Sequence, residues 1–431
     1  MVLVELFDSE PIENLAGFIV TKPRKVVFLG EKKKTERFEK IFRSVAKNRN
    51  INTIFESRPV NRNFLQGIVD VLEDLVHLFN EENPEEEIVF DLCGGDDLML
   101  VAAGIVYKAH SEIIQLQRYN VYTNKLIDCD ENILLESQPR AEMSFEEYTR
   151  IHGGCVIASE YKSSRKSRWE ITPELKSDVA KMWAICARDY RRWNKNTGII
   201  AKAASDMNSL PLNIEVDLAR EPSKTKEDYK SFIKMLLNAG LINNLKQKGN
   251  FYSFAFKNRG VQHCLLKAGV LLELYITIVA ESIKENGQKV YNDVMMGAQI
   301  DWDGIKSPMA GIDVANEIDV VLMRGLRPIF ISCKNGSFLP EELYKLSAVA
   351  KHFGGQYAKK VLVTNYLSAS DNPARKDNCL QQKDEPNDKY MKRLKRQLLW
   401  SRAQEMDIKI LCRETIKDEA AATEALKNLY K

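Results

Sequence analysis

Short apolar runs alternate with amphipathic segments through the first third of the chain. The run KVVFLG ends at Gly30 and precedes a polar loop and a segment with one apolar helical face, formed by Phe38, Ile41, Phe42 and Val45. The further runs INTIFE, EEIVFDL and EIIQLQ are separated by two more segments with helical patterns. Strands that alternate with helices predict an α/β fold with a parallel, doubly wound sheet.

Two loops follow strands of this predicted sheet, and ligands of such sheets bind beyond the carboxyl ends of the strands. Glycines let backbone N–H groups approach a phosphate or a ribose, lysines neutralise phosphates, and acids accept hydrogen bonds from ribose or adenine. An ordinary strand-to-helix turn is the alternative interpretation of the second loop, Cys93–Asp97. The candidate ligand-binding residues are Gly30, Glu31, Lys32, Lys33, Gly94, Gly95, Asp96 and Asp97.

The middle of the chain, residues 140–258, has a different pattern. TPELKSDVAKMWAICARDYRRW predicts a long helix, and the later segment from SFIKMLLNAGL to FYSFAFKN predicts a helix, a strand, a Lys-Gly turn and a second strand. That order resembles a winged-helix unit, which either binds DNA or serves as a packing or dimerisation element. The basic and aromatic stretch Arg188–Lys195 suits nucleic acid but equally suits a solvated helix end.

Near the C-terminus, two apolar runs flank the turn Arg324–Arg327 and predict a β-hairpin. Because side chains alternate across a strand, Glu317 and Asp319 share one face of the first strand, and Ser332 and Lys334 share one face of the second. If those faces coincide, carboxylates and an ammonium meet within an apolar sheet. Such burial is costly unless the groups pair with each other or hold a metal.

A lone acid, Glu273, also interrupts the apolar segment LLKAGVLLELYITIVAESI, which has the length of a buried helix. A helical segment and the strand KVLVTN follow the hairpin. This part of the chain resembles the core of the PD-(D/E)XK nuclease fold, which carries an acid on one strand and acid-x-Lys on the next. Asp319 matches the first acid and Lys334 the lysine, whereas Ser332 stands where the family has an acid.

The resemblance implies a metal-dependent nuclease with Asp319, Glu317, Glu273 and Lys334 as catalytic residues. A divalent ion, Mn²⁺ or Mg²⁺, is held by hard oxygen ligands in such chemistry. We expect Asp319, Glu317 and Glu273 to supply them, with Ser332 Oγ or the Cys333 carbonyl completing the set. A lysine near the phosphate orients or helps to deprotonate the attacking water and offsets developing charge.

The turn in FDLCGGDDLMLVAAG resembles the signature turn of CARF domains, which sense cyclic oligoadenylates in type III CRISPR immunity. That family often has Thr and Thr-Lys around the Gly pair, where this chain has Cys93, Asp96 and Asp97. A CARF-like N-terminus and a PD-(D/E)XK-like C-terminus together resemble the CARF nucleases of the DUF1887 group. This combination implies a homodimer that binds cyclic tetra-adenylate across its two CARF domains and thereby activates its nuclease domains.

Composition excludes little beyond membrane and disulfide-rich classes. The 431 residues carry a net charge of +3, and none of their apolar stretches has the length of a membrane span. The eight cysteines form no CxxC or Cys/His cluster, which favours a reduced, cytoplasmic protein without a zinc site. We expect three parts: a CARF-like Rossmann domain at 1–139, a winged-helix-like α+β section at 140–258 and a nuclease domain at 259–431.

The sequence therefore predicts an endonuclease that hydrolyses single-stranded RNA or DNA, with nicked duplex as a further substrate, and leaves the choice among them open. One alternative is a cyclic-oligoadenylate-responsive regulator whose winged-helix-like section binds DNA and whose nuclease-like domain is inactive, as Ser332 would suggest. Another is a DNA-repair nuclease with an unrelated nucleotide-binding domain.

Overall fold

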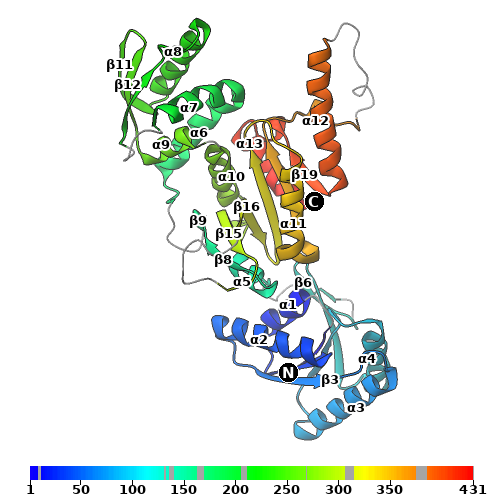
Figure 1. Ribbon diagram of the computed structural model, residues 1–431. Coiled ribbons are helices and arrows are strands. Elements are labelled where there is room, and N and C mark those ends of the chain that lie inside the picture. Colours follow the sequence, from blue (N-terminus) through cyan, green and yellow to red (C-terminus); the bar gives the residue numbers. More distant parts are fainter. Residues whose placement is uncertain are drawn as a thin grey trace. The chain divides into compact units, whose positions relative to one another are not determined.

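The protein is described from a computed structural model that covers residues 1–7, 11–130, 133–134, 140–162, 169–204, 211–267, 269–305, 315–374 and 386–430 (Figure 1). Its contacts divide the chain into two compact units. Unit 1 comprises Met1–Gly153 with Arg324–Arg327, and unit 2 comprises Gly154–Met323 with Pro328–Lys431. The α/β class is confirmed, whereas the division into three parts stays a prediction.

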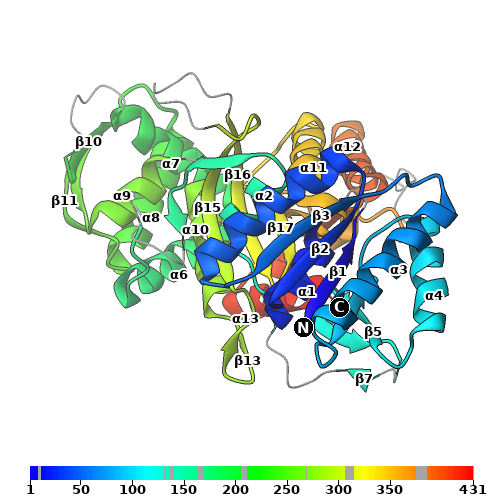
Figure 2. The ribbon, with the colours of Figure 1, turned by 90° about the horizontal axis from the view of Figure 1, so that it is seen from below.

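Unit 1 is built on a seven-stranded sheet of order β3-β2-β1-β4-β5-β6-β7, in which the first five strands are parallel. Figure 2 shows β3, β2 and β1 side by side. The central strand, β1, was not among the predicted strands, although its uninterrupted burial is typical of the middle of a parallel sheet. The strands are β1 (Val2–Leu6), β2 (Lys25–Gly30), β3 (Ile54–Pro59), β4 (Ile88–Asp91), β5 (Ile114–Asn120), β6 (Lys125–Asp128) and β7 (Ile133–Leu134).

Helices cover both faces of this sheet, as the alternating pattern predicted. Aromatic contacts join α1 and α2 to one face, through Phe18, Phe28, Phe42 and Phe55. A second apolar core packs α3 and α4 against the other face. The helices are α1 (Pro11–Thr21), α2 (Lys32–Arg49), α3 (Leu65–Glu82), α4 (Asp97–Ala109) and α5 (Phe145–Ile151).

The main sheet of unit 2 has the order β19-β18-β17-β16-β15-β8, with β9 also paired to β15. Strands β17, β18 and β19 are parallel, and β15 runs antiparallel to β16 and β8. The predicted succession of helix, hairpin, helix and strand is present as α10, β16–β17, α11 and β18, but the buried strand β15, which was not predicted, precedes the hairpin. The strands are β8 (Cys155–Ala158), β9 (Tyr161–Lys162), β15 (Asp293–Asp301), β16 (Ala315–Arg324), β17 (Arg327–Lys334), β18 (Lys359–Thr364) and β19 (Ile408–Leu411).

Four helices accompany this sheet: α10 (Val270–Ser282), α11 (Glu341–Gly354), α12 (Asn387–Glu405) and α13 (Glu419–Lys427). A two-residue turn joins β13 (Lys284–Glu285) to β14 (Gln288–Lys289) in a short hairpin. Short 3₁₀ helices occupy Gly355–Tyr357, Ala369–Asp371, Arg413–Ile416 and Asn428–Tyr430. Within the described ranges, no helix combines the length and the apolar character that crossing a membrane requires.

From Gly154 onward, the section predicted at 140–258 lies within unit 2, whereas its first residues, 140–153, belong to unit 1. Helix α8 is followed by the antiparallel hairpin β11–β12, and β10 extends it to a three-stranded sheet. Helix α6 packs on α10, since Trp183 stacks on Tyr275 with 4.7 Å between ring centroids. The elements are α6 (Pro173–Arg188), α7 (Tyr190–Ala204), β10 (Asn213–Asp217), α8 (Ser223–Asn238), β11 (Ile242–Lys248), β12 (Phe251–Phe256) and α9 (Arg259–Leu266).

The basic and aromatic stretch at the start of α7 is part of this packing. Tyr190 and Trp193 are buried in the core, and Arg192 forms an ion pair with Asp228 at 2.7 Å. These aromatic rings are therefore not available as stacking surfaces for bases.

Candidate active site and ligand-binding loops

The hairpin β16–β17 brings the predicted catalytic acid and the residues of the next strand together. Asp319 Oδ2 accepts hydrogen bonds from Ser332 Oγ at 3.2 Å and from the Cys333 backbone N–H at 2.6 Å. Gly325, with φ of +67°, provides the left-handed residue of the connecting turn. The Cys333 side chain is buried in the apolar core, and burial raises the pKa of its thiol well above the ordinary value. The thiol is thus a core group rather than a ligand.

Lys334 lies between two carboxylates. Its Nζ is 3.9 Å from Asp319 Oδ2 and 2.7 Å from Glu342 Oε2 at the start of α11. Burial acts to lower the pKa of Lys334, but the two carboxylates raise it above its ordinary value. The hydrogen bond that Lys334 donates to Glu342 lowers the pKa of Glu342. Lys334 is therefore a fixed positive charge. Glu342 was not predicted, although acids in the first turn of the helix after the lysine are visible in the sequence.

Glu273, in the first turn of α10, belongs to the same electrostatic cluster. Burial, followed by repulsion from Asp319 and Glu317, raises its pKa to about 8. An acid with this pKa is mostly protonated at neutral pH unless a cation is added. Gly269, the N-cap of α10, has φ of +92°, and a Cβ there would lie 3.2 Å from Glu273 Oε1. Glycine at this position therefore leaves room for the carboxylate.

A fourth acid, Glu160, also contributes to the raised pKa of Glu273 and was not predicted. It lies between β8 and β9, where its backbone N–H donates to Met296 O at 2.9 Å. Its Oε2 accepts a hydrogen bond from Trp169 Nε1 at 3.2 Å. The strands β8 and β9 are too short to be recognised from periodicity. Glu160 is placed near the site by their pairing with β15, which is far away along the chain.

A cavity of about 30 Å³ opens beside the hairpin. A space of this size holds an ion or one to two waters but not a nucleotide. Its polar lining comes from both strands of the hairpin and from the first two turns of α11, namely Glu317, Asp319, Ser332, Lys334, Glu342 and Lys345. The phosphate of a substrate would therefore meet this site from outside.

Hard carboxylate oxygens and a fixed ammonium are a donor set that suits Mg²⁺ or Mn²⁺. Glu317, Asp319 and Glu273 would hold the ion, with Ser332 Oγ beside them. Their oxygens do not all lie within 4.8 Å of one another, a spacing that among the described residues is met by the group Glu73, His77 and His110 in unit 1. Binding an ion at the hairpin would thus draw the acids together.

In unit 1 the predicted loops follow β2 and β4, which flank the central strand β1. From β1 the sheet continues through β2 and β3 on one side and through β4 and β5 on the other. The loop after β4 therefore lies at the topological switch point of the sheet. Both loops approach β1 closely, since a Cβ on Gly30 would lie 2.8 Å from Phe7 O and one on Gly94 2.5 Å from Leu6 O. These two glycines are therefore required by packing. Gly95, with φ of +88°, makes the left-handed turn.

The acidic and basic residues of these loops have different environments. Asp96 is the N-cap of α4, accepts a hydrogen bond from Met99 N at 3.2 Å and pairs with Arg62 at 2.7 Å. Its carboxylate is thus engaged in structural contacts. Glu31, the N-cap of α2, and the adjacent Lys32 and Lys33 are exposed, as is Asp97. Lys32 and Lys33 therefore present positive charge to solvent at the start of α2.

A buried polar network lies beneath the β4 loop and was not predicted. Asn14 Nδ2 donates to Glu5 Oε2 at 2.6 Å, and Gln117 Nε2 donates to Asp91 Oδ2 at 2.9 Å. Burial raises the pKa of Asp91 to about 6, and burial with repulsion from Asp91 raises the pKa of Glu5 well above its ordinary value. The Cys93 backbone N–H donates to Asp91 Oδ1 at 2.8 Å, which fixes the first residue of the loop.

Known structures share this fold along the whole chain. Protein VC1899 from Vibrio cholerae aligns with a TM-score of 0.70 and 16% identity, covering 100% of this chain and 97% of that one. Can2 from Sulfobacillus thermosulfidooxidans, solved in complex with cyclic tetra-adenylate, aligns with a TM-score of 0.62 and 14% identity, covering 100% and 99%. The resemblance to CARF nucleases is thus confirmed at the level of the fold. No protein-family model and no curated protein sequence matches the chain.

Proposed function

We propose that this protein is a metal-dependent nuclease that cyclic tetra-adenylate activates as a homodimer. The observation that carries the proposal is the meeting of Asp319, Ser332 and Lys334 on one face of the hairpin, beside a small polar cavity. A dead domain would have no physical reason to retain a buried acid such as Glu273 next to two other acids. The full-length structural similarity to Can2, which was solved with cyclic tetra-adenylate, supports the choice of activator.

Each residue has a distinct role in the proposed hydrolysis. Asp319, Glu317 and Glu273 would hold a divalent ion, which would neutralise charge at the phosphoryl group and lower the pKa of water. Lys334, held by Asp319 and Glu342, orients the attacking water and offsets the charge that develops on the phosphoryl oxygens. Asp319 also receives the Cys333 backbone N–H, which fixes the spacing between the acid and the lysine.

In unit 1 the activator would lie over the carboxyl ends of the strands, with Lys32 and Lys33 near its phosphates and the turn at Gly95 near a ribose or base. Because Asp96 already caps α4 and pairs with Arg62, we assign it to holding the loop. A ring with two-fold symmetry suits a dimer in which both copies present the same loops.

The test is cleavage of labelled single-stranded RNA and DNA with Mn²⁺ or Mg²⁺ and cyclic oligoadenylates of each ring size. We expect cleavage only with the activator and the metal, and its loss in Asp319→Ala and in Lys334→Ala. The matched control is Glu341→Gln, which removes the exposed acid next to Glu342 and should leave the rate unchanged. Cleavage that is independent of every ring would favour a repair nuclease.

A second function, a ligand-responsive DNA-binding regulator, is favoured by one observation. Ser332 stands where an acid would complete the metal site, and its hydroxyl bonds to Asp319. In that case no combination of metal ion and cyclic oligoadenylate would support cleavage. Cyclic tetra-adenylate would instead change the affinity of the protein for duplex DNA in a gel-shift assay. Glu317→Gln tests the same point, because its loss of cleavage would show that Glu317 replaces the missing acid.

A further inference from the structure

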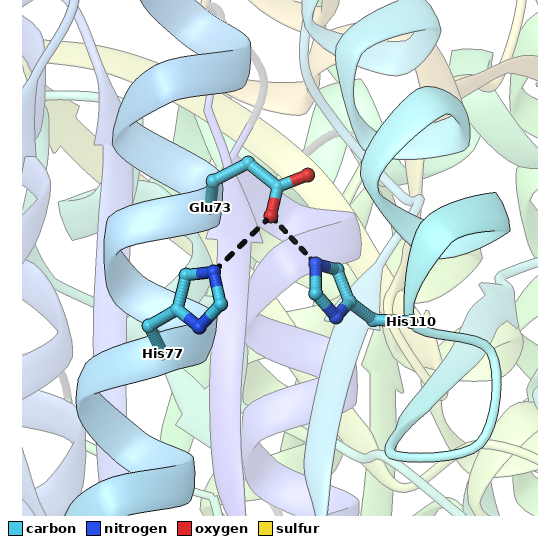
Figure 3. Close-up of side chains that lie close together, drawn as sticks. All are labelled: Glu73, His77 and His110. Carbon is cyan, nitrogen blue, oxygen red and sulfur yellow. Dashed lines mark hydrogen bonds and ion pairs between the residues drawn. The ribbon is translucent and has the colours of Figure 1, made fainter.

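Three potential metal ligands converge at the surface of unit 1, away from the predicted loops. Glu73 and His77 lie four residues apart on α3 and therefore share a face, and His110 is the C-cap of α4. Figure 3 shows the three side chains pointing toward one another. Glu73 Oε2 is 2.6 Å from His110 Nε2 and 3.9 Å from His77 Nε2. Two of the five histidines of the chain thus meet at one carboxylate.

The spacing of these atoms suits a transition-metal ion. All three ligand atoms lie within 4.8 Å of one another. Around a tetrahedral Zn²⁺ with bonds of about 2.0–2.1 Å, ligand atoms are about 3.3 Å apart. The two observed distances, 2.6 and 3.9 Å, lie on either side of that value, so side-chain shifts below about 1 Å would close the site. His77 is 67% exposed, while His110 is 19% exposed, and the two rings lie edge to face with 5.5 Å between their centroids.

The electrostatic surroundings independently favour a cation. Between Leu65 and Glu87 the sequence contains eight acids and no lysine or arginine. His110 stands at the carboxyl end of α4, where its backbone N–H donates to Val106 O and Tyr107 O and where the helix dipole is negative. An imidazole pair with one carboxylate selects Zn²⁺ or a neighbouring transition metal over Mg²⁺, which prefers oxygen ligands.

We propose that Glu73, His77 and His110 bind a transition-metal ion of the Zn²⁺ class, with water in the remaining position. The ion would join the C-terminal half of α3 to the carboxyl end of α4, and these two helices pack side by side on one face of the sheet (Figure 1). At its opposite end, α4 is already held by the ion pair at 2.7 Å between its N-cap Asp96 and Arg62, which lies three residues before α3. Metal binding would therefore add a second link between these segments at the far end of α4, the helix that follows the β4 loop.

The competing interpretation is an ordinary hydrogen bond between Glu73 and His110 beside an exposed histidine. The two interpretations differ in the role of His77, whose Nε2 is 3.9 Å from Glu73 and too far for a hydrogen bond. If Glu73 and His110 only form a hydrogen bond, removing His77 leaves that bond intact. If the three residues bind a metal ion, removing His77 removes one of its ligands.

The experiment uses the full-length protein, stripped with a chelator and titrated with Zn²⁺ against a chromophoric competitor, with Co²⁺ absorption as a second readout. We expect one equivalent of Zn²⁺ to remain bound in Asp319→Asn, which disables the proposed ion site of the hairpin, together with the visible bands of tetrahedral Co²⁺ and a rise in melting temperature. His77→Ala and His110→Gln should each weaken binding by about tenfold or more. The control is His352→Ala, in unit 2, whose ring stacks on Trp302 at 4.3 Å and which should bind Zn²⁺ like the parent.

The proposal fails if His77→Ala binds Zn²⁺ with the stoichiometry and affinity of the parent, or if the parent binds none. Because His77 is mostly exposed, this variant should fold like the parent. Its circular dichroism spectrum verifies this. None of these readouts involves nucleic acid or cyclic oligoadenylate, so the result is independent of the proposed nuclease activity.

Discussion

Each unit has a group of acids on or beside its main sheet, but the two acid groups have different surroundings. In unit 1, Glu5 and Asp91 are completely buried and are bonded to the neutral amides of Asn14 and Gln117. In unit 2, the acids around Asp319 lie beside a cavity and a lysine. Burial raises the pKa of an acid in each group. A raised pKa by itself therefore does not distinguish a structural network from a catalytic one.

The distinguishing features are a fixed cation and access to solvent. The Glu5–Asp91 network is closed further by Gly17, where a Cβ would lie 2.2 Å from Asp91 Oδ2, so that no substrate group can enter. The hairpin site has room for an ion or water and a lysine whose ammonium is held by two carboxylates. We therefore assign the first network to the stability of the β4 loop and the second to chemistry.

The largest expected difference between the two groups is in cleavage rate. Asp319→Asn should lower the cleavage rate by about 10³-fold, because a metal ligand and a partner of Lys334 are lost together. Asp91→Asn, assayed at saturating activator, should stay within about threefold of the parent, because no substrate reaches it. Initial rates on labelled RNA and DNA give the comparison. Equal losses in both variants would contradict the distinction between the two acid groups.

Glu273→Gln should reduce cleavage by about 10²-fold at a fixed Mn²⁺ concentration, because the ion loses a charged ligand. The melting temperature should stay constant or rise, since a carboxyl that burial and Asp319 destabilise in its charged form is replaced by a neutral amide. Metal titrations of the rate, combined with thermal unfolding, measure both effects. A variant with parental rate at every Mn²⁺ concentration would remove Glu273 from the metal site.

The pH dependence of unit 1 should depend on Asp91. The unfolded chain releases this proton near pH 3.8, whereas the folded chain holds it until about pH 6. The folded state therefore binds more protons within this window, and its stability falls by about 1–3 kcal/mol as the pH rises from about 4 to 6. In Asp91→Asn the part of this loss that Asp91 causes should be absent, whereas the part that burial of Glu5 causes remains.

Hydrogen exchange of β1 and β4 in parent and variant, compared at the same pH, measures this effect locally. A local readout is required because all five tryptophans, Trp169, Trp183, Trp193, Trp302 and Trp400, lie in unit 2. If the stability of the parent and of the variant depended on pH in the same way, Asp91 would not be the cause of the fall in stability.

The smallest effect should follow from the ion pair at the start of α11. Among the described residues, Glu342→Gln leaves Asp319, at 3.9 Å, as the carboxylate partner of Lys334 and should change the cleavage rate by about three- to tenfold. Glu341→Gln, one position earlier and exposed, should have no effect. Rates measured in parallel across pH 6–9 test both. If the two variants are indistinguishable, Glu342 does not position the lysine.

The sequence predicted those parts whose signal is local. Alternating side chains predicted that Ser332 and Lys334 share a face of one strand of the hairpin and left open whether that face coincides with the face of Asp319, and the βα periodicity predicted the sheet of unit 1. The signal for β1 is a single short run with one acid in it, and the partner that makes Glu5 tolerable, Asn14, comes from a neighbouring helix. Glu160 and Glu342 reach the site through tertiary packing, which periodicity does not encode.

The hydrogen bond from Trp169 Nε1 to Glu160 Oε2 gives the hairpin site a natural optical probe. Indole emission responds to the charge and polarity next to its N–H group. An ion bound close to Glu160 would change the charge beside this indole, and the difference in emission between the parent and Trp169→Phe would then report occupancy without a label or a substrate.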